Sequence, residues 1–305
     1  MTIDYLGIFH AERGFRSLMP EMLPSVLLGV CLAAGTVSQA GAQAIITASP
    51  DITIGVSSGA VVTDEESAVD NQLGITLQES YGALPAGSEL IALGRDVDGD
   101  SLLAFDTTVS LSGGVIASPG DVMRFDGSTY TTEFDASAEG VPAGVYTDAV
   151  SVSSPGLILS FDTTTSLPGG IIVADEDLVR WDGGSFSVVL DGSTVGMTSN
   201  LDIDAVQDLG AGVFAVSFDT TGSLDGAVFG DEDLMRWDGT SWSLEYDASA
   251  SDSDWIPADL NAVVVVPEPG LISLLFAGGA SLVGLRRNGV GLRRNRVGLR
   301  RSRKA

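Results

Sequence analysis

The sequence predicts an all-β protein, a repeat domain folded as a four-bladed β-propeller, and three observations lead to this prediction. A stretch that starts with Phe-Asp-Thr-Thr recurs from Phe105, Phe161 and Phe218, and each copy ends in an Arg-aromatic-Asp-Gly turn. The resulting period of about 56 residues is typical of solenoids and propellers. Gly, Ser, Thr, Asp and Val dominate residues 45–266, where apolar side chains show no helical spacing. Finally, the first repeat unit lacks one strand, and the chain has one extra strand after the last complete unit that can supply it.

Each repeat contains four short segments with the composition and alternation of β-strands, which we name A to D in chain order. In the last complete copy we expect these strands at residues 201–207, 213–218, 233–237 and 241–246, with a loop at 219–231. An Asp-Gly pair joins C to D, and it favours a hairpin turn with positive φ at both positions. The pairs are Asp126-Gly127, Asp182-Gly183 and Asp238-Gly239.

The two ends of the repeat region predict how the ring closes. Residues 57–66 match residues 168–177 without gaps, so the first unit supplies strands B, C and D, near 52–56, 67–70 and 74–78. It lacks strand A, and residues 258–264 match strand A of the last complete copy. We therefore expect 258–264 to pair with 52–56, which leaves no open sheet edge. The alternative is a β-solenoid or sandwich of three repeats, and the sequence does not say which strand lines the axis.

Residues 1–44 have the order of a secretory signal, and residues 45–266 form the repeat domain. Arg13 and Arg16 precede an apolar run at 23–34, and Ala42 and Ala44 form an A-x-A cleavage site. The single His and the single Cys of the chain both lie before residue 45. A Ser-His-Asp triad, a Cys nucleophile and a His/Cys zinc site are therefore excluded from the repeat domain.

The repeat domain is strongly acidic. Its four arginines face 37 Asp and Glu residues, which gives a net charge of −33, and it contains no Lys. Such a surface repels nucleic acid and anionic lipid, so neither is expected as a partner.

The last 39 residues, 267–305, carry a recognisable order of features. The motif Pro267-Glu268-Pro269-Gly270 precedes an apolar segment at 271–285, and Arg286 and Arg287 follow. This ending resembles the PEP-CTERM sorting signal. The resemblance implies processing by an exosortase-type enzyme, transient insertion of the apolar helix in the inner membrane, and delivery to the cell surface or to extracellular exopolysaccharide. The tandem Arg-rich copies after Arg287 depart from the short tail usual in that family.

Several polar residues recur or cluster in the repeat domain. Asp96, Asp98 and Asp100 resemble the opening of a calcium loop, although the later Glu of such a loop is replaced by Thr107. The repeated aspartates either accept hydrogen bonds in turns or contribute to Ca²⁺ sites. We expect the repeated arginines to form ion pairs with repeated aspartates, between strands or between blades. We expect the aromatic residues Phe125, Trp181, Trp237 and Trp242 to pack between blades rather than stack on sugars. The repeated aspartates are Asp106, Asp162 and Asp219, and the repeated arginines are Arg124, Arg180 and Arg236.

These observations favour an exported protein of the cell surface or biofilm matrix that is not an enzyme. A carbohydrate-binding module for the exopolysaccharide is one alternative. A glycoside hydrolase with paired carboxylates is another, because carboxylates are the main catalytic groups that the domain retains.

Overall fold

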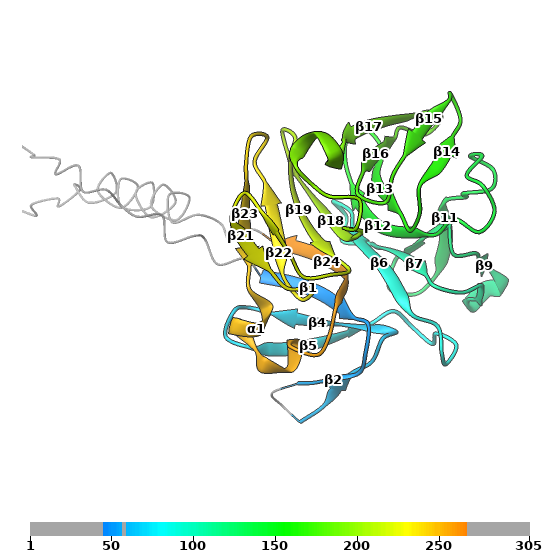
Figure 1. Cartoon of the computed structure of the whole chain (residues 1–305). Helices are drawn as coiled ribbons and strands as arrows, with labels where there is room; N and C mark the ends of the chain where they lie inside the picture. The colour runs from blue at the N-terminus through cyan, green and yellow to red at the C-terminus, as the bar shows by residue number, and fades with distance from the viewer. Residues whose placement is uncertain (1–44, 57–58, 267–305) are drawn as a thin grey trace, which may run out of the picture. The chain divides into compact units, whose positions relative to one another are not determined.

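The computed structural model describes residues 45–56 and 59–266, and these form a four-bladed β-propeller (Figure 1). Each blade is an antiparallel sheet of four strands. Written from the axis outward, blade one is β24 (Leu260–Val266), β1 (Ile45–Pro50), β4 (Glu66–Asp70) and β5 (Ile75–Ser80). Blade two is β6 (Leu90–Arg95), β7 (Ser101–Phe105), β10 (Val122–Phe125) and β11 (Tyr130–Phe134). Blade three is β12 (Thr147–Val152), β13 (Leu157–Phe161), β16 (Leu178–Trp181) and β17 (Phe186–Leu190). Blade four is β18 (Ile203–Gly210), β19 (Val213–Phe218), β22 (Leu234–Trp237) and β23 (Trp242–Tyr246).

Strand A of each repeat lines the propeller axis. β6 contacts β12, β12 contacts β18, β18 contacts β24, and β24 contacts β6, so the four inner strands form a ring. In every blade, the first residues of strand A pair with the last residues of strand B, as Thr147 does with Phe161. One end of the axis is therefore surrounded by the starts of all four A strands.

The ring closes through the chain ends, as expected, but with a different strand B. β24 pairs antiparallel with β1, which places Ile45 opposite Val266 and Ala48 opposite Val263. The prediction that the last strand A pairs with residues 52–56 was wrong, because β2 (Ile54–Gly55) belongs to a separate two-stranded sheet. Burial explains the difference, because Ile46 and Ala48 are fully buried between sheets whereas Ile52 is exposed.

A small hairpin replaces the loop that was expected between strands B and C. In the last repeat its two strands join at Asp225 and Gly226, which both have positive φ, 50° and 85°. The Asp-Gly turn with two positive φ angles thus occurs here. At the three predicted Asp-Gly turns only the glycines have positive φ, and each loop spans four residues. The hairpins are β2 with β3 (Val61–Val62), β8 (Val109–Ser110) with β9 (Ile116–Ala117), β14 (Thr165–Leu167) with β15 (Ile171–Val173), and β20 (Gly222–Leu224) with β21 (Ala227–Phe229).

The hydrophobic core is divided into four clusters, each between neighbouring blades. The Phe of each Phe-Asp-Thr-Thr stretch is fully buried in such a cluster. Trp181 of blade three packs edge-on against Phe134 of blade two, with ring centroids 5.1 Å apart. Burial between blades therefore holds together a domain that has no Cys.

Two short helices connect the last blade back to the first. α1 (Ala248–Ser251) and η3 (Ser253–Trp255) follow β23 and bring the fully buried Trp255 against blade one. The indole N–H of Trp255 donates to Asp70 Oδ2 at 3.0 Å, and Ser251 Oγ donates to Asp70 Oδ1 at 2.6 Å. We call this contact the closing clasp. The remaining short helices are η1 (Ser112–Gly114) and η2 (Gly192–Val195).

The predicted sorting segments, with Ala42, Ala44, the motif at 267–270, Arg286 and Arg287, lie outside the described residues. Within residues 45–56 and 59–266, no helix is long and apolar enough to cross a membrane.

Candidate functional site

The repeated aspartates after strand B fix where strand A begins. Asp162 Oδ1 accepts a hydrogen bond from the backbone N–H of Tyr146 at 2.7 Å, and the Asp162 N–H donates to the carbonyl of Tyr146 at 3.2 Å. The same reciprocal contact joins Asp106 to Glu89, Asp219 to Asp202, and Asp51 to Asp259. These aspartates form part of the scaffold in all four blades.

A second set of repeated aspartates stabilises the turn before strand C. Asp177 accepts backbone N–H groups of Ala174 and Gly192, both at 2.9 Å. Asp233 accepts the N–H groups of Gly230 and Ala248 in the same way. Most of the repeat-specific acidity therefore serves backbone hydrogen bonding.

The four arginines of the domain contact residues other than the repeated aspartates. Arg124 pairs with Glu133 at 2.9 Å and also with Asp96 and Asp100, and Arg95 pairs with Glu79. Arg236 lies 3.5 Å from Glu245, whereas Arg180 donates to Ser153 Oγ. The partners are thus mainly glutamates on neighbouring strands and the Asp96 turn, not the repeated aspartates.

The candidate calcium loop is a turn with its own counter-charge. Asp96 Oδ1 accepts the backbone N–H groups of Asp98 and Asp100, both at 2.9 Å, and its other oxygen pairs with Arg124. The Asp98 side chain is exposed, and Gly99 has a φ of 91°. Asp96, Asp98 and Asp100 are therefore not brought together around a metal position in this structure.

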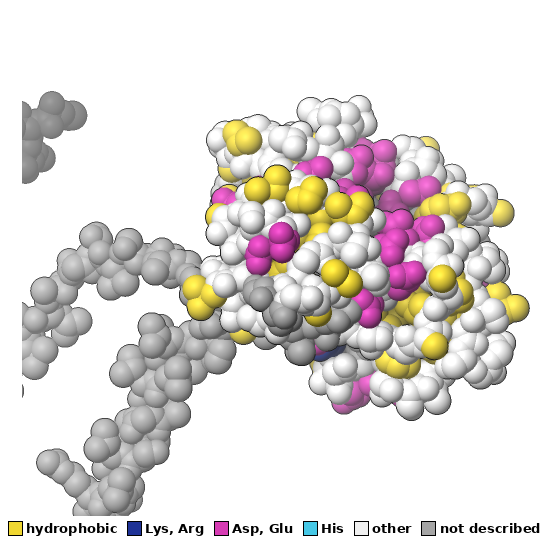
Figure 2. All heavy atoms as spheres, turned by 90° about the horizontal axis from the view of Figure 1, so that it is seen from below, with side chains coloured by type: hydrophobic (Ala, Val, Ile, Leu, Met, Phe, Trp, Pro, Cys, Tyr) yellow, Lys and Arg dark blue, Asp and Glu magenta, His cyan; other side chains and the backbone are white. Residues whose placement is uncertain are grey.

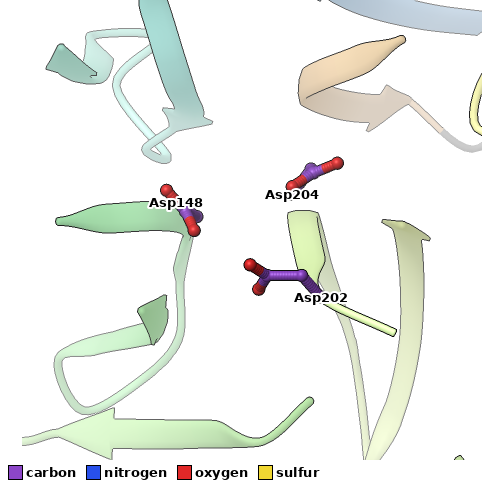
Figure 3. Close-up of side chains that lie close together, drawn as sticks. All are labelled: Asp148, Asp202 and Asp204. Atoms are coloured by element: carbon purple, nitrogen blue, oxygen red, sulfur yellow. The ribbon is translucent and has the colours of Figure 1, made fainter. Parts of the chain in front are cut away.

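A different group of carboxylates converges at the axis, where strands A begin. Asp148 is the second residue of β12, Asp204 is the second residue of β18, and Asp202 directly precedes β18. Each offers an oxygen that lies within 4.8 Å of the others. Figure 3 shows the three side chains converging from the two neighbouring strands. We call these three residues the axial carboxylates.

The placement of these residues follows from a β-bulge at the start of strand A. Thr147 pairs with Phe161 and Ala149 pairs with Ser160, which leaves Asp148 without a partner, and Asp204 lies in the same way between Ile203 and Ala205. The residues on either side of each bulge are buried, and the bulge re-aims the side chain of its extra residue, so Asp148 and Asp204 can converge. Blades two and one have Ile91 and Asn261 at this position, so the carboxylates occur on one side of the axis.

The axial carboxylates repel one another in a poorly solvated place. Burial and the nearby Asp202 raise the pKa of Asp148 to about 9. Burial followed by repulsion from other aspartates raises the pKa of Asp202 to about 7, and it raises that of Asp204 well above its usual range. Asp259, which precedes β24, is shifted to a pKa of about 8 by burial and neighbouring acids. The cause in each case is the cost of placing negative charge there without a positive partner.

Three oxygen atoms in this region have no hydrogen-bond partner within the described part of the chain. They are Asp202 Oδ1, Asp204 Oδ2 and Asp259 Oδ1, and all three are buried from solvent. Buried acceptors are normally paired, so these three oxygens are exceptions in a domain whose other aspartates mostly accept backbone N–H groups. On a wider scale, acidic side chains form a band across the face seen in Figure 2, with hydrophobic side chains on both sides.

The repeated aromatic residues pack against other side chains, although Trp181 and Trp237 are only half-buried. Trp242 is buried, its indole N–H donates to the carbonyl of Val195 at 2.9 Å, and Trp237 lies against it with ring centroids 5.3 Å apart. The indole N–H of Trp181 donates to Glu139. Phe125 is paired with Tyr130 at 4.7 Å. None of these four aromatic rings is free of packing partners.

Comparisons with known proteins add little. No protein-family profile matches the chain, and no curated protein matches it. A solved structure of a protein of unknown function from Bacteroides caccae is similar over 66% of this chain, with a TM-score of 0.24 and 9% sequence identity. The similarity spans 56% of that protein's length. A likeness this weak carries no argument about function.

Proposed function

We propose that this chain is an exported, non-catalytic protein of the cell surface or exopolysaccharide matrix, sorted by the signal at residues 267–305. The support from sequence is the order of motif, apolar segment and Arg pair at the end of the chain. We expect an exosortase-type enzyme to process the chain, and we expect the processed protein to be associated with exopolysaccharide.

One structural observation supports this proposal most directly. Ile45 and Val266 are paired residues of β1 and β24, so the propeller is complete between them. Both predicted sorting segments lie outside that span, and their removal leaves every blade whole. The first and last paired residues also lie at the end of the axis opposite the axial carboxylates, because strand A starts at the carboxylate end and β24 is an A strand.

The geometry gives less support to the two alternatives. The two catalytic carboxyl groups of a glycoside hydrolase flank the glycosidic bond that is cut, so both must be open to a sugar chain. Asp202 Oδ1 and Asp204 Oδ2 are instead buried from solvent. A sugar-stacking platform needs free aromatic faces, whereas Trp181, Trp237 and Trp242 are packed against other rings.

Sorting can be tested with a variant in which Pro267, Glu268 and Pro269 are all replaced by Ala. We expect this variant to stay unprocessed in the inner membrane fraction of the producing bacterium, whereas the parent chain reaches the surface or matrix. Immunoblots of separated fractions measure this. The matched control replaces Arg300 and Arg301 with Ala, which leaves the motif and the first Arg pair intact. Normal surface delivery of the Pro-Glu-Pro variant would contradict the proposed sorting.

The absence of catalysis needs a separate measurement. We expect the purified chain to release no new reducing ends from purified exopolysaccharide over a long incubation. Release that is abolished by Asp148→Asn would instead support the hydrolase. This assay does not depend on delivery to the surface. Catalytic activity would therefore contradict the non-catalytic role and leave the test of sorting unaffected.

A further inference from the structure

The axial carboxylates have no counter-charge from the part of the chain that the structure describes. The domain has four basic side chains, and each one is engaged elsewhere, three in ion pairs and Arg180 with Ser153. Asp148 and Asp204 come from neighbouring blades, so their repulsion acts directly across the interface between blades three and four. An external cation would remove this repulsion at the place where the inner strands meet.

Asp204 provides an observation that is independent of the clustering. Its Oδ2 atom is buried from solvent and accepts no hydrogen bond from the described residues. Asp202 Oδ1 is buried and unpartnered in the same way. By contrast, the scaffold aspartates, such as Asp162 and Asp177, accept backbone N–H groups. The axial oxygens differ from these scaffold carboxylates because no described group donates to them.

We propose that Asp148, Asp202 and Asp204 bind one Ca²⁺ ion that bridges blades three and four. All donors are carboxylate oxygens, which select a hard cation rather than a thiophilic or imidazole-binding metal. Ca²⁺ has oxygen ligands at about 2.3–2.6 Å, so ligands on opposite sides of the ion lie about 5 Å apart. The spacing of the three oxygens, within 4.8 Å, fits that span. Mg²⁺ requires a tighter octahedron at about 2.0–2.1 Å and fits this open arrangement less well.

The proposal predicts both direct binding and added stability. A cation that binds the folded state alone shifts the folding equilibrium toward that state as its concentration rises above Kd. Ionic screening also reduces repulsion, but without saturation and without regard to ion identity. Because a carboxyl ligand must lose its proton to bind a metal, the titration is done above the raised pKa of Asp148. Calorimetric titration of the full chain with CaCl₂ at about pH 9.5 should show saturable binding of about one ion per chain. Thermal unfolding at equal ionic strength should show a higher midpoint in CaCl₂ than in NaCl.

The critical variant is Asp148→Asn/Asp204→Asn, and Asp98→Asn is its matched control. Loss of an outer-shell partner typically weakens metal binding about 10–100-fold, so loss of two ligands should exceed that range. Circular dichroism in EDTA should show that the double variant is folded, because two neutral amides reduce the repulsion. The exposed Asp98 belongs to the Asp96 turn, so Asp98→Asn should bind Ca²⁺ like the parent chain.

Three results would overturn the proposal. These are an absence of saturable Ca²⁺ binding in the parent chain, unchanged binding in the double variant, and loss of binding in Asp98→Asn alone. Equal midpoints in MgCl₂ and CaCl₂ would overturn the choice of Ca²⁺. Saturable binding that disappears only with the axial carboxylates, together with a Ca²⁺-specific rise in midpoint, would establish the site.

Discussion

Replacement of Asp70 by Ala should strongly destabilise the propeller, because Asp70 is the acceptor at the centre of the closing clasp. Asp70 is fully buried and accepts hydrogen bonds from Ser251 Oγ at 2.6 Å and Trp255 Nε1 at 3.0 Å. It also accepts the backbone N–H of Gln72 at 2.7 Å, but that group lies near the surface and can bond to water. The buried Trp255 donor costs about 1–3 kcal/mol when it is left unpaired, and the half-buried Ser251 loses a hydrogen bond worth about 0.5–1.5 kcal/mol. Asp70→Ala should therefore lower the free energy of unfolding by about 1.5–4.5 kcal/mol.

A double-mutant cycle with Trp255→Phe separates this hydrogen bond from general packing damage. Phe keeps most of the buried ring but has no N–H, so the single variant should lose about 1.5–3 kcal/mol, the value of a hydrogen bond to a charged group. The double variant should then be more stable than the sum of the two losses predicts, by about 0.5–3 kcal/mol. Urea unfolding of the full chain, followed by far-UV circular dichroism, measures all four proteins without relying on Trp fluorescence. Additive losses would refute the direct Asp70–Trp255 contact as the basis of the clasp.

Three further predictions concern the blades. Gly156→Ala should destabilise the protein more than Gly183→Ala. Both glycines have positive φ, but only at Gly156 would the new Cβ clash with a backbone atom, the carbonyl oxygen of Trp181. Equal urea midpoints for the two variants would contradict this. Arg124→Gln should lower the melting temperature more than Arg236→Gln, because Arg124 contacts three carboxylates and Arg236 contacts one at 3.5 Å. A larger loss of melting temperature in Arg236→Gln would contradict this. Burial, followed by repulsion from nearby acids, raises the pKa of Glu89 to about 7. The folded state therefore holds this proton more tightly than the unfolded state, and stability falls as the proton is lost between about pH 5 and 8. Glu89→Gln should flatten the decline of melting temperature over that range, and an unchanged decline would count against this reasoning.

The repeat pattern predicted the architecture because alike residues occupy alike places in each blade. The period that starts at Phe161 carries the four strands, the buried Phe and the following Asp. The error in strand B of blade one arose from choosing a strand near Ile52 by local composition. The gapless offset of 111 residues that aligns 57–66 with 168–177 also aligns β13 with residues 46–50, and this range nearly coincides with β1. Consistent use of that offset would have identified the correct strand.

The axial carboxylates escaped prediction for the opposite reason. The position that holds Asp148 and Asp204 holds Ile91 in blade two and Asn261 in blade one, so it varies between repeats. A search for recurring residues finds the scaffold and overlooks a site built where the repeats differ. The usable signal was the alternation of strand A in the last repeat, where Asp202 and Asp204 flank the buried Ile203. Asp148 comes from the neighbouring blade, and its approach to Asp202 and Asp204 depends on how the inner strands are arranged around the axis. The sequence of a single repeat does not reveal that arrangement.

The pairing of β1 with β24 also determines how the domain responds to mechanical load. Ile45 and Val266 are opposite one another, and hydrogen bonds in an antiparallel pair run perpendicular to the strands. A pulling force applied between these two residues therefore loads a single pair of bonds at a time and peels the seam open from its end. A force applied through Val266 alone, with Ile45 free, puts no such tension across the seam. We therefore expect the propeller to stay closed when force acts through Val266 alone, and to open at lower force when it is pulled between Ile45 and Val266.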